Sequence, residues 1–505
     1  MGPQDVPWLS LATWAPAAAA LIILALKPGA RRTIQAVALL GTGFSLVVSI
    51  YLFFLMSGTP DAQFHFKEIL PWSPTLGIQY KLGLDGISAP MLLLAGIICF
   101  AATVMSLDIV VRVKEYFCLA LVAMSGVFGV FTSLDLFFFV LFYELASIPM
   151  FFLVGIWGSN KLASGKPIYR DRAAMKLLLY LQLGGGIVLL GILGLYFGAE
   201  VHTFDWEALS KLKLAVGHQK VLFLILFVGF GIEAGLVPFH TWLPEGHSSA
   251  PTPLSMLLAG VLLKMGGYGI LRVGVELLPD GAKYWMGHLA FLGIVNVLYG
   301  GLCALRQSDI KVMIAYSSVS HMGMCFLSLA CINGSAPYSM FGLSGLVFQM
   351  FSHGIITALL FAVAGTVYSI THSRDFRGWG GLANRMPYLT VFYVLGAMGS
   401  LGLPTMTGFV AELMVFLGVW GTVWYLVPFT VPGLIITTIY LLRSVQYGFF
   451  GPLNPEHLQA RDALPHEKFA MGMLALTTLT FGIFPYLLLH VSNPTLQDFV
   501  TRIGQ

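Results

Sequence analysis

Apolar runs alternate with short polar stretches along nearly the whole chain. A helix needs about 20 apolar residues to cross the hydrocarbon layer of a membrane, and most of these runs are that long. At this length per span, the pattern predicts about 14 transmembrane helices. Their expected starts lie near residues 8, 32, 87, 114, 135, 172, 220, 252, 285, 308, 338, 388, 424 and 467. We therefore expect an all-α polytopic membrane protein, with residues 1–505 forming one membrane domain.

Glycine and proline interrupt two of these runs. The first, GIEAGLVPFHTWLPEGHSSAPTPLSMLLAGVLLK, places Glu233 ahead of Pro238 and ends on Lys264. The second, SLGLPTMTGFVAELMVF, places Pro404 ahead of Glu412. A broken helix frees backbone carbonyls that lipid cannot satisfy, so such a segment must line protein or water. We expect helices 7 and 12 to be broken, with ionisable groups close to both breaks.

The two broken helices lie five spans apart. Because five is odd, a repeated five-helix unit enters the membrane in the opposite orientation each time, which is the arrangement of an inverted repeat. We expect residues 114–275 (helices 4–8) and 285–450 (helices 9–13) to be two such repeats. Binding groups then lie near the middle of the membrane.

Composition and charge narrow the class further. A chain that is 57% hydrophobic and 10% charged is not a soluble globular protein. Basic residues gather in the loops after odd-numbered helices, including Lys161 and Lys166, while loops after even-numbered helices carry fewer, among them Lys213. Basic loops stay in the cytoplasm, so we expect a multi-pass protein of the inner (cytoplasmic) cell membrane with both termini on the external, periplasmic side. No basic tract indicates nucleic-acid binding.

The cysteines show no metal or redox pattern. All five lie in apolar runs without CxxC or Cys/His spacing: Cys99, Cys118, Cys303, Cys325 and Cys331. The sequence also contains no Walker A or GxGxxG motif. We therefore expect no metal and no bound cofactor in this chain, and place any electron or nucleotide chemistry in other chains.

Four ionisable residues lie where hydrocarbon is expected: Glu144, Glu233, Lys264 and Glu412. A charge there is costly unless it is paired, hydrated or neutralised, so a functional site is the default interpretation. Buried acids whose pKa is set by their surroundings suit proton transfer. The alternative for each acid is a protonated carboxyl satisfied by a neighbouring hydroxyl. Lys264 has no partner in its own run and is the natural counter-charge to Glu144 or Glu233.

Histidines extend this set. His321 and His353 fall inside helices 10 and 11, where each is either a proton relay or a hydrogen-bonded core residue. One turn earlier on the same helices stand the polar residues expected to support them: Ser317, Ser318 and Gln349. In the loop PFHTWLPEGHSSAP, the residues His240, Glu245 and His247 are either proton-uptake groups or loop structure. Asp85 and Asp135 are expected to cap helix starts.

Four stretches together resemble a known family. They are LGLDGIS (82–88), SLDLFFFVLFYELASIPMFFLVGIWG (133–158), PFHTWLPEGHSSAPTPLSMLLAGVLLKMGGYGILR (238–272) and QSDIKVMIAYSSVSHMG (307–323). They closely resemble the antiporter-like subunits of respiratory complex I, and the resemblance covers roughly residues 80–450. The same family includes subunits of multisubunit cation/proton antiporters and of energy-converting membrane hydrogenases.

The resemblance implies roles position by position. Glu144 matches the family's glutamate in helix 5, Lys264 its lysine in helix 8, and Glu412 its exit-side acid in helix 12, while His321 and His353 match the central relay. One position departs, because this chain has Glu233 where the family usually has lysine in broken helix 7. We expect that Glu144 and Glu233, if close, share one proton, since neighbouring carboxylates resist simultaneous ionisation.

By resemblance, the chain is a proton-translocating subunit of an NADH:quinone oxidoreductase. FMN, iron–sulfur clusters and quinone would lie in partner chains, and the partners would be the neighbouring antiporter-like chains L and N and a hydrophilic redox arm. Two alternatives stay open. One is a subunit of a cation/proton antiporter or of a membrane hydrogenase, and the other is a structural scaffold whose polar residues carry no protons.

Overall fold

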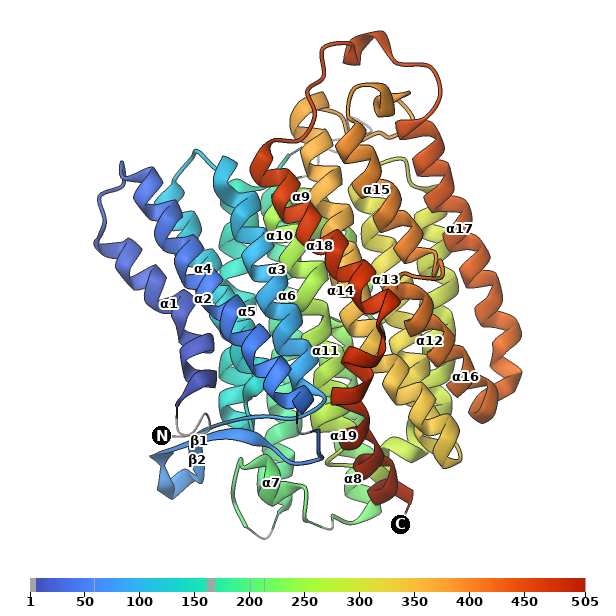
Figure 1. Cartoon of the computed structure of the whole chain (residues 1–505). Helices are drawn as coiled ribbons and strands as arrows, with labels where there is room; N and C mark the ends of the chain where they lie inside the picture. The colour runs from blue at the N-terminus through green and yellow to red at the C-terminus, as the bar shows by residue number, and fades with distance from the viewer. Residues whose placement is uncertain (1–5, 59, 161–168, 200, 213, 505) are drawn as a thin grey trace.

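A computed structural model describes residues 6–58, 60–160, 169–199, 201–212 and 214–504. Long helices stand side by side, and both termini lie at the same end of the bundle, together with a small β-hairpin (Figure 1). The helices of the first half are α1 (Trp8–Ala25), α2 (Arg31–Gly58), α3 (Ser88–Met105), α4 (Val113–Thr132), α5 (Leu136–Trp157), α6 (Arg170–Gly198) and α8 (Val216–Glu233).

The second half is built in the same way. Its helices are α12 (Pro279–Arg306), α13 (Ile310–Leu329), α14 (Ala336–Thr371), α15 (Pro387–Ser400), α16 (Thr407–Val423), α17 (Val427–Phe449), α18 (Pro465–Ile483) and α19 (Tyr486–Gly504). Short helices α7 (Trp206–Leu209) and α9 (Trp242–Ser249) lie in connections. Strands β1 (His65–Ser73) and β2 (Ile78–Leu84) pair antiparallel. The expectation of an all-α polytopic membrane protein is confirmed.

By length and apolar composition, 12 helices of the described residues can cross a membrane, or up to 13 if the pair α18 and α19, bent by 66°, forms one span. One of the 12, Thr407–Phe449, contains both α16 and α17. The short α15 precedes α16 as the first half of a broken helix. When α15 and α16 are counted as one broken helix and α17 as the next helix, the observed helices correspond to the expected starts. The assignment of two inverted repeats stays a prediction.

Helix 7 is broken after Glu233, as expected. Gly235 there has a φ of 77°, in the left-handed region that favours glycine. Asn296 of α12 satisfies the freed backbone: its side-chain oxygen accepts from the Val237 N–H at 2.9 Å, and its amide donates to the Gly235 carbonyl at 3.1 Å. A buried side chain thus replaces the helical hydrogen bonds that the break removes.

Helix 12 is broken between α15 and α16. Gly402 has a φ of 66°, and a Cβ added to it would lie 2.6 Å from Oε2 of Glu412. Glycine is therefore needed at this position for two reasons. It readily adopts the left-handed backbone conformation, and it has no side chain that would block the approach of the Glu412 carboxyl. The break sets the Glu412 carboxyl beside unwound backbone.

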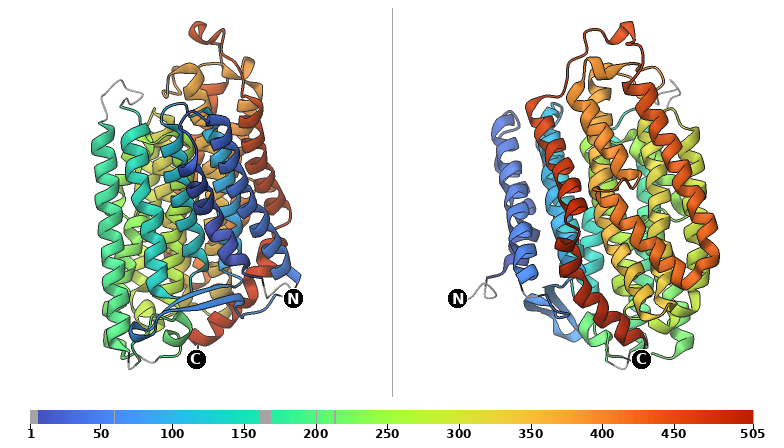
Figure 2. Two further views of the ribbon diagram at one scale, coloured as in Figure 1. Left: turned by 90° about the vertical axis from the view of Figure 1, so that its left-hand side faces the viewer. Right: turned by 45° about the vertical axis from the view of Figure 1, so that its right-hand side comes forward.

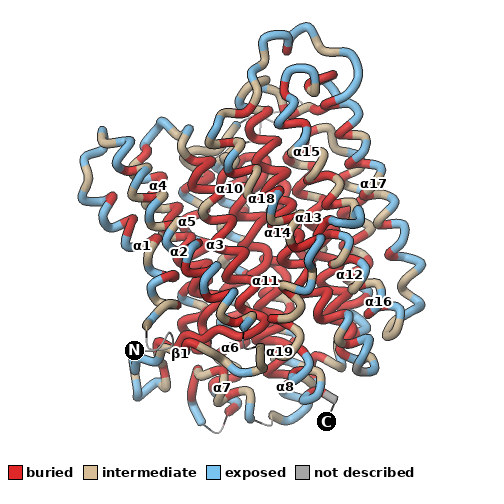
Figure 3. Tube along the Cα trace, viewed as in Figure 1, coloured by how far each residue is buried: buried red, intermediate tan, exposed pale blue. Residues whose placement is uncertain are grey.

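The centre of the bundle is the segment that carries Lys264. It runs without interruption through α10 (Thr252–Leu257), a π-helical stretch η4 (Leu258–Leu262), α11 (Leu263–Gly269) and a second π-helical stretch η5 (Ile270–Val275). The most apolar 18-residue stretches of this segment and of α14 are fully buried within the chain. Buried residues concentrate around α11 and α14 in the middle of the bundle (Figure 3). π-helical turns inside helices are frequent at functional sites.

The ends of the bundle separate the two classes of loop. α1 and α2 stand at one edge of the bundle (Figure 2), and the connection between them lies at the end opposite to the termini. The β-hairpin and α7 lie at the end of the termini. Three basic residues of the loop-charge argument, Lys161, Lys166 and Lys213, lie outside the described residues.

Candidate functional site

Lys264 and His353 are in direct contact. Nζ of Lys264 lies 2.8 Å from Nδ1 of His353 and also donates to the Ala259 carbonyl. Lys264 is completely buried, and His353 is 3% exposed. This contact needs one proton between the two nitrogens, so either a charged lysine donates to a neutral ring or a ring N–H donates to a neutral amine. The pair can exchange a proton without moving its heavy atoms far.

His353 continues the contact towards α13 and α16. Its ring centroid lies 5.3 Å from that of His321. Nε2 of His321 lies 3.0 Å from Oγ of Ser400, and Nδ1 lies 3.8 Å from Oε1 of Glu412. Glu412 is 6% exposed. Lys264, His353, His321 and Glu412 therefore form one buried polar column, referred to below as the Lys–His–Glu column.

A small cavity lies against this column. Its volume is about 10 Å³, and its lining includes both histidines, Ser400 and Glu412. A cavity of about this size admits the centre of a single water molecule. In the described part of the chain, Nε2 of His353 has no hydrogen-bond partner. A water in the cavity has polar partners on two sides, which is what a bridging water requires.

Two supporting contacts differ from expectation. Gln349 was expected to support His353, its neighbour on the same helix, but its amide nitrogen instead lies 3.4 Å from Nδ1 of His321. The hydroxyl of Ser318 donates to the Ile314 carbonyl of its own helix at 3.1 Å. Within the described residues, the hydroxyl of the buried Ser317 makes no hydrogen bond to His321. Gln349 and Ser400 are the partners of His321 because of the way the helices pack together. Spacing along one helix does not determine such contacts between helices.

Glu144 and Glu233 lie on neighbouring elements. The Glu144 carboxylate, half-buried on α5, accepts from the Gln182 amide and from Ser147 Oγ at 3.3 Å. It lies against Gly185 of α6, where a Cβ would meet Glu144 Oε1 at 2.1 Å. Glycine at this position therefore gives the acid access to Gln182.

Glu233 is completely buried at the break. Neither of its carboxyl oxygens has a hydrogen bond that meets normal geometry within the described residues, although the Tyr143 hydroxyl and the charge of Glu144 both interact with it. Lys264 contacts His353 and Ala259 instead. The amine of Lys264 therefore points to the relay side, and its role as counter-charge to Glu144 or Glu233 stays a prediction.

The proposed uptake residues lie on and near α9. His247 is buried and its ring stacks on Phe361 at 4.6 Å, while His240 packs edge-on against Tyr299 at 5.0 Å. Within the described residues, none of the four ring nitrogens has a hydrogen-bond partner. Glu245 forms an ion pair with Lys176 at 2.7 Å. Ring packing holds these two histidines in place. Within the described residues, neither forms a hydrogen bond to the Lys–His–Glu column.

An ion cluster that the sequence reading missed lies at the end of the termini. Nη2 of Arg272 lies 2.6 Å from both carboxylate oxygens of Asp85, and Nη1 lies 2.9 Å from Glu276. Asp85 does cap α3, accepting from the backbone N–H of Ser88 at 2.9 Å. Asp135 likewise caps α5, as expected. The pair Asp85 and Arg272 is 187 residues apart in sequence, so no local pattern indicates it.

Comparison with known proteins identifies the family of this chain. The family model described as NADH:quinone oxidoreductase/Mrp antiporter, TM, matches residues 133–437. A relative from Acaryochloris marina, NAD(P)H-quinone oxidoreductase chain 4, is 36% identical over 515 residues, which cover 100% of this chain and 94% of the relative.

Solved structures share the fold. A chain of respiratory complex I from Thermus thermophilus with bound NADH superposes with a TM-score of 0.88 at 26% identity, covering 98% of this chain and 100% of the other. A chain of the Mrp complex from Dietzia sp. DQ12-45-1b gives 0.83 at 21% identity, covering 98% and 99%, and shows likeness of fold alone. Since the family model covers more than half of the sequence and the curated relative matches at full length, this chain belongs to the NADH:quinone oxidoreductase/Mrp antiporter family of membrane subunits.

Proposed function

We propose that this chain is a proton-translocating membrane subunit of an NAD(P)H:quinone oxidoreductase, in the position of chain 4. The observation that carries the proposal is the buried Lys–His–Glu column, in which Lys264, His353, His321 and Glu412 follow one another at contact or near-contact distances. Ionisable groups are costly inside a membrane, so a continuous series of them requires a role in charge transfer.

Each residue of the Lys–His–Glu column carries out one step of the proton transfer. Lys264 takes a proton from the side of Glu144 and Glu233 and passes it to His353. The proton then moves to His321, either directly or through water in the adjoining cavity, and on to Glu412. Imidazole suits the middle steps because it both accepts and donates near neutral pH. His240 and His247 take up protons at one face, and Ser317, Ser318 and Gln349 support the histidines.

Glu144 and Glu233 act as one unit that holds a single shared proton. Two neighbouring carboxylates resist simultaneous ionisation, and Glu233 lacks the hydrogen bonds that would stabilise its charge. A change in the charge of this unit alters the cost of a charge on Lys264, because interactions in a low-dielectric interior reach further than in water. Redox energy from partner chains would enter here.

The rest of the assembly follows from family membership. FMN, iron–sulfur clusters and quinone belong to partner subunits, and this chain carries no redox centre. Its partners are the neighbouring antiporter-like chains L and N and a hydrophilic redox arm. It resides in the cytoplasmic membrane with both termini outside, as the loop charges predict. Residues 114–275 and 285–450 form the two inverted repeats.

The complex reconstituted in liposomes provides the test. Lys264→Met should lower proton uptake into the liposomes several-fold per electron transferred, while the assembled complex keeps its subunits. Lys27→Met, the same chemical change at an exposed lysine, is the matched control and should pump normally. Unchanged pumping by an assembled Lys264→Met complex would reject the proposal and favour a structural scaffold.

A second candidate is a cation/proton antiporter subunit. It is favoured by Glu233, which sets two carboxyls and the Tyr143 hydroxyl together where the family usually has lysine. Unwound backbone near such oxygen atoms is typical of sodium sites in transporters. Uptake of radioactive sodium that depends on Glu233 and is coupled to proton efflux would support this candidate, and transport independent of sodium would exclude it.

A further inference from the structure

Lys264 shares its helix with a second column of polar residues that leads away from His353. Tyr268 and Arg272 follow Lys264 at intervals of four residues, so all three lie close to one face of the segment. Eight residues of helix span about 12 Å. The series runs from Lys264, in the middle of the bundle, to the end where the termini lie.

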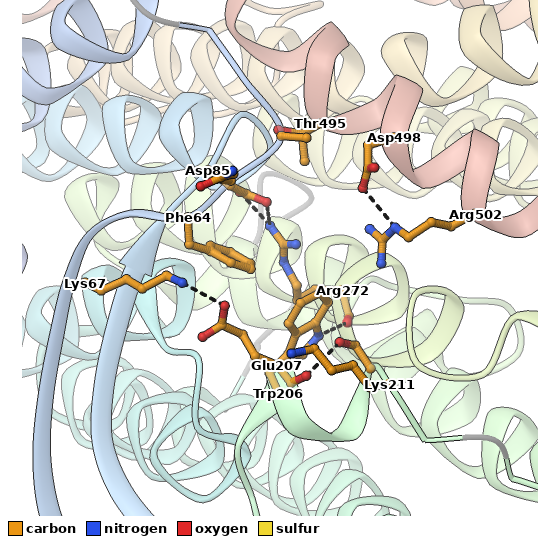
Figure 4. Close-up of a pocket in the computed structure, with 13 residues that line it drawn as sticks. Phe64, Lys67, Asp85, Trp206, Glu207, Lys211, Arg272, Thr495, Asp498 and Arg502 are labelled. Carbon is orange, nitrogen blue, oxygen red and sulfur yellow. Dashed lines mark hydrogen bonds and ion pairs between the residues drawn. The ribbon is translucent and has the colours of Figure 1, made fainter.

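A cavity opens at the far end of this series. Its volume is about 340 Å³, and it is lined by residues from the β1 connection, α7 and α19, among them Lys67, Glu207 and Arg502. Arg272 reaches it from the helix, next to Trp206 (Figure 4). Several charged side chains line this cavity, so we expect it to be hydrated. Arg272 is among the residues that line it.

Arg272 is fixed on every side. It is 2% exposed, is paired with Asp85 and Glu276, and its Nε donates to the Tyr268 hydroxyl at 3.2 Å. The rings of Phe64 and Trp206 each lie 5.3 Å from its guanidinium carbon. A planar cation held by two carboxylates and two rings keeps one position.

The hydrogen bonds at Tyr268 interrupt proton transfer. Its hydroxyl donates to the Phe131 carbonyl at 3.3 Å and accepts from Arg272. Its one proton therefore points to Phe131 and not along the series towards Arg272. Arg272 cannot continue a relay, because a guanidinium stays protonated in proteins and has no lone pair to accept a proton. Glu276 follows Arg272 by four residues, so along the helix Arg272 is the first charged residue of the cluster that the series from Lys264 reaches.

We propose that Arg272 is a positioning residue that closes the short route from Lys264 to the cavity at the end of the termini. The guanidinium itself accepts no proton, so a proton that leaves Lys264 along this series meets a fixed cation, as in pores that exclude protons. Protons on Lys264 are thereby restricted to the contact with His353. Asp85 and Glu276 hold the arginine in place. This inference rests on the proposed function, since it assumes that Lys264 carries protons.

Passive proton leak measures this role without any electron donor. The whole complex is placed in liposomes containing a pH-sensitive dye, and a potassium diffusion potential drives protons inward. Arg272→Gln is the direct variant, but it leaves two buried acids without their cation and can disturb assembly. Asp85→Asn combined with Arg272→Gln removes one charge of each sign, so the net charge of the cluster is unchanged. This double variant is the decisive one.

The double variant is expected to leak at least ten times faster than the unmodified complex. One control separates the arginine from general damage. Lys67→Gln removes a charge from the same cavity without touching Arg272, so it should leak at the original rate. An assembled double variant with the original leak rate overturns the proposal. Lost redox-driven pumping without added leak also overturns it, because the column would then be an outlet.

A third variant separates this inference from the proposed function. Adding Lys264→Met to the double variant should abolish the leak, because the leaking proton passes through Lys264. A leak that persists shows a path that avoids Lys264 and overturns the role of Arg272. Redox-driven pumping that survives Lys264→Met alone instead rejects the proposed function, whatever the leak rates are.

Discussion

The contact between Lys264 and His353, 2.8 Å from Nζ to Nδ1, joins the two predicted five-helix repeats. Lys264 belongs to α11 in residues 114–275, and His353 belongs to α14 in residues 285–450. The two elements are also the most deeply buried parts of the bundle. A proton that crosses this contact leaves one repeat and enters the other, so a change in the packing of α11 on α14 would open or close the transfer.

Replacing His353 should break this transfer. In His353→Leu the ring nitrogen beside Lys264 is lost, and the next ring, that of His321, has its centroid 5.3 Å from that of the lost ring. Proton pumping per electron should fall at least five-fold in liposomes, with a smaller effect on electron transfer. His372→Leu, which changes an exposed histidine at the end of α14, is the control and should pump normally. Equal pumping by both variants would contradict the relay.

Glu233 offers a test of the shared proton. Glu233→Gln keeps the shape of the side chain but can no longer ionise, so Glu144 should ionise without a competing charge. Pumping per electron should drop at least two-fold. Glu115→Gln at an exposed position of α4 is the matched change and should have no effect. Full coupling in an assembled Glu233→Gln complex would end the shared-proton hypothesis.

Asn296 should be needed for stability at the break in helix 7. Asn296→Leu removes the hydrogen bonds to Val237, Gly235 and Val319 and leaves buried backbone groups unsatisfied. A loss of this kind costs roughly 1–3 kcal/mol. The apparent Tm of the detergent-solubilised complex should fall by several degrees. Asn333→Leu, which removes one exposed contact to Lys283, should leave the Tm nearly unchanged.

Sequence reasoning reached the helices and both breaks because these features are local. Apolar length determines which segments span, and glycine and proline determine where Glu233 and Glu412 lie relative to unwound backbone. Partners across helices were not predictable in the same way. Ser400 and Gln349 meet His321 through packing between α13, α14 and α15, and the pairing of Asp85 with Arg272 depends on how distant segments dock.

Lys264 illustrates the same limit. The sequence identified it as the charge to be compensated but not the direction of its side chain. A helical side chain leans back towards the preceding turn, and the amine here reaches the Ala259 carbonyl and His353 rather than Glu233. The π-helical stretches on either side of α11, which shift the helical register, are likewise not indicated by any residue pattern.

The β-hairpin is fastened to α7 by ion pairs whose effect depends on pH. Nζ of Lys81 lies 2.7 Å from both Asp205 and Glu207, and Lys67 lies 2.8 Å from Glu207. Burial opposes the charge on Lys81, but its hydrogen bonds to the two carboxylates outweigh burial and raise its pKa. Burial likewise opposes the charge on Glu207, but hydrogen bonds from the two lysines outweigh it and lower the pKa of Glu207.

These shifts predict where the fastening weakens. The contribution of Glu207 is complete above its unfolded pKa of about 4.3 and is lost as the pH falls through its lowered folded value. The contribution of Lys81 is complete below its unfolded pKa of about 10.4 and is lost as the pH rises through its raised folded value. Hydrogen-exchange protection factors of β2 and α7 should therefore be constant between these limits and fall outside them. Lys81→Met should remove the alkaline decrease, and a decrease that persists in this variant would contradict the assignment.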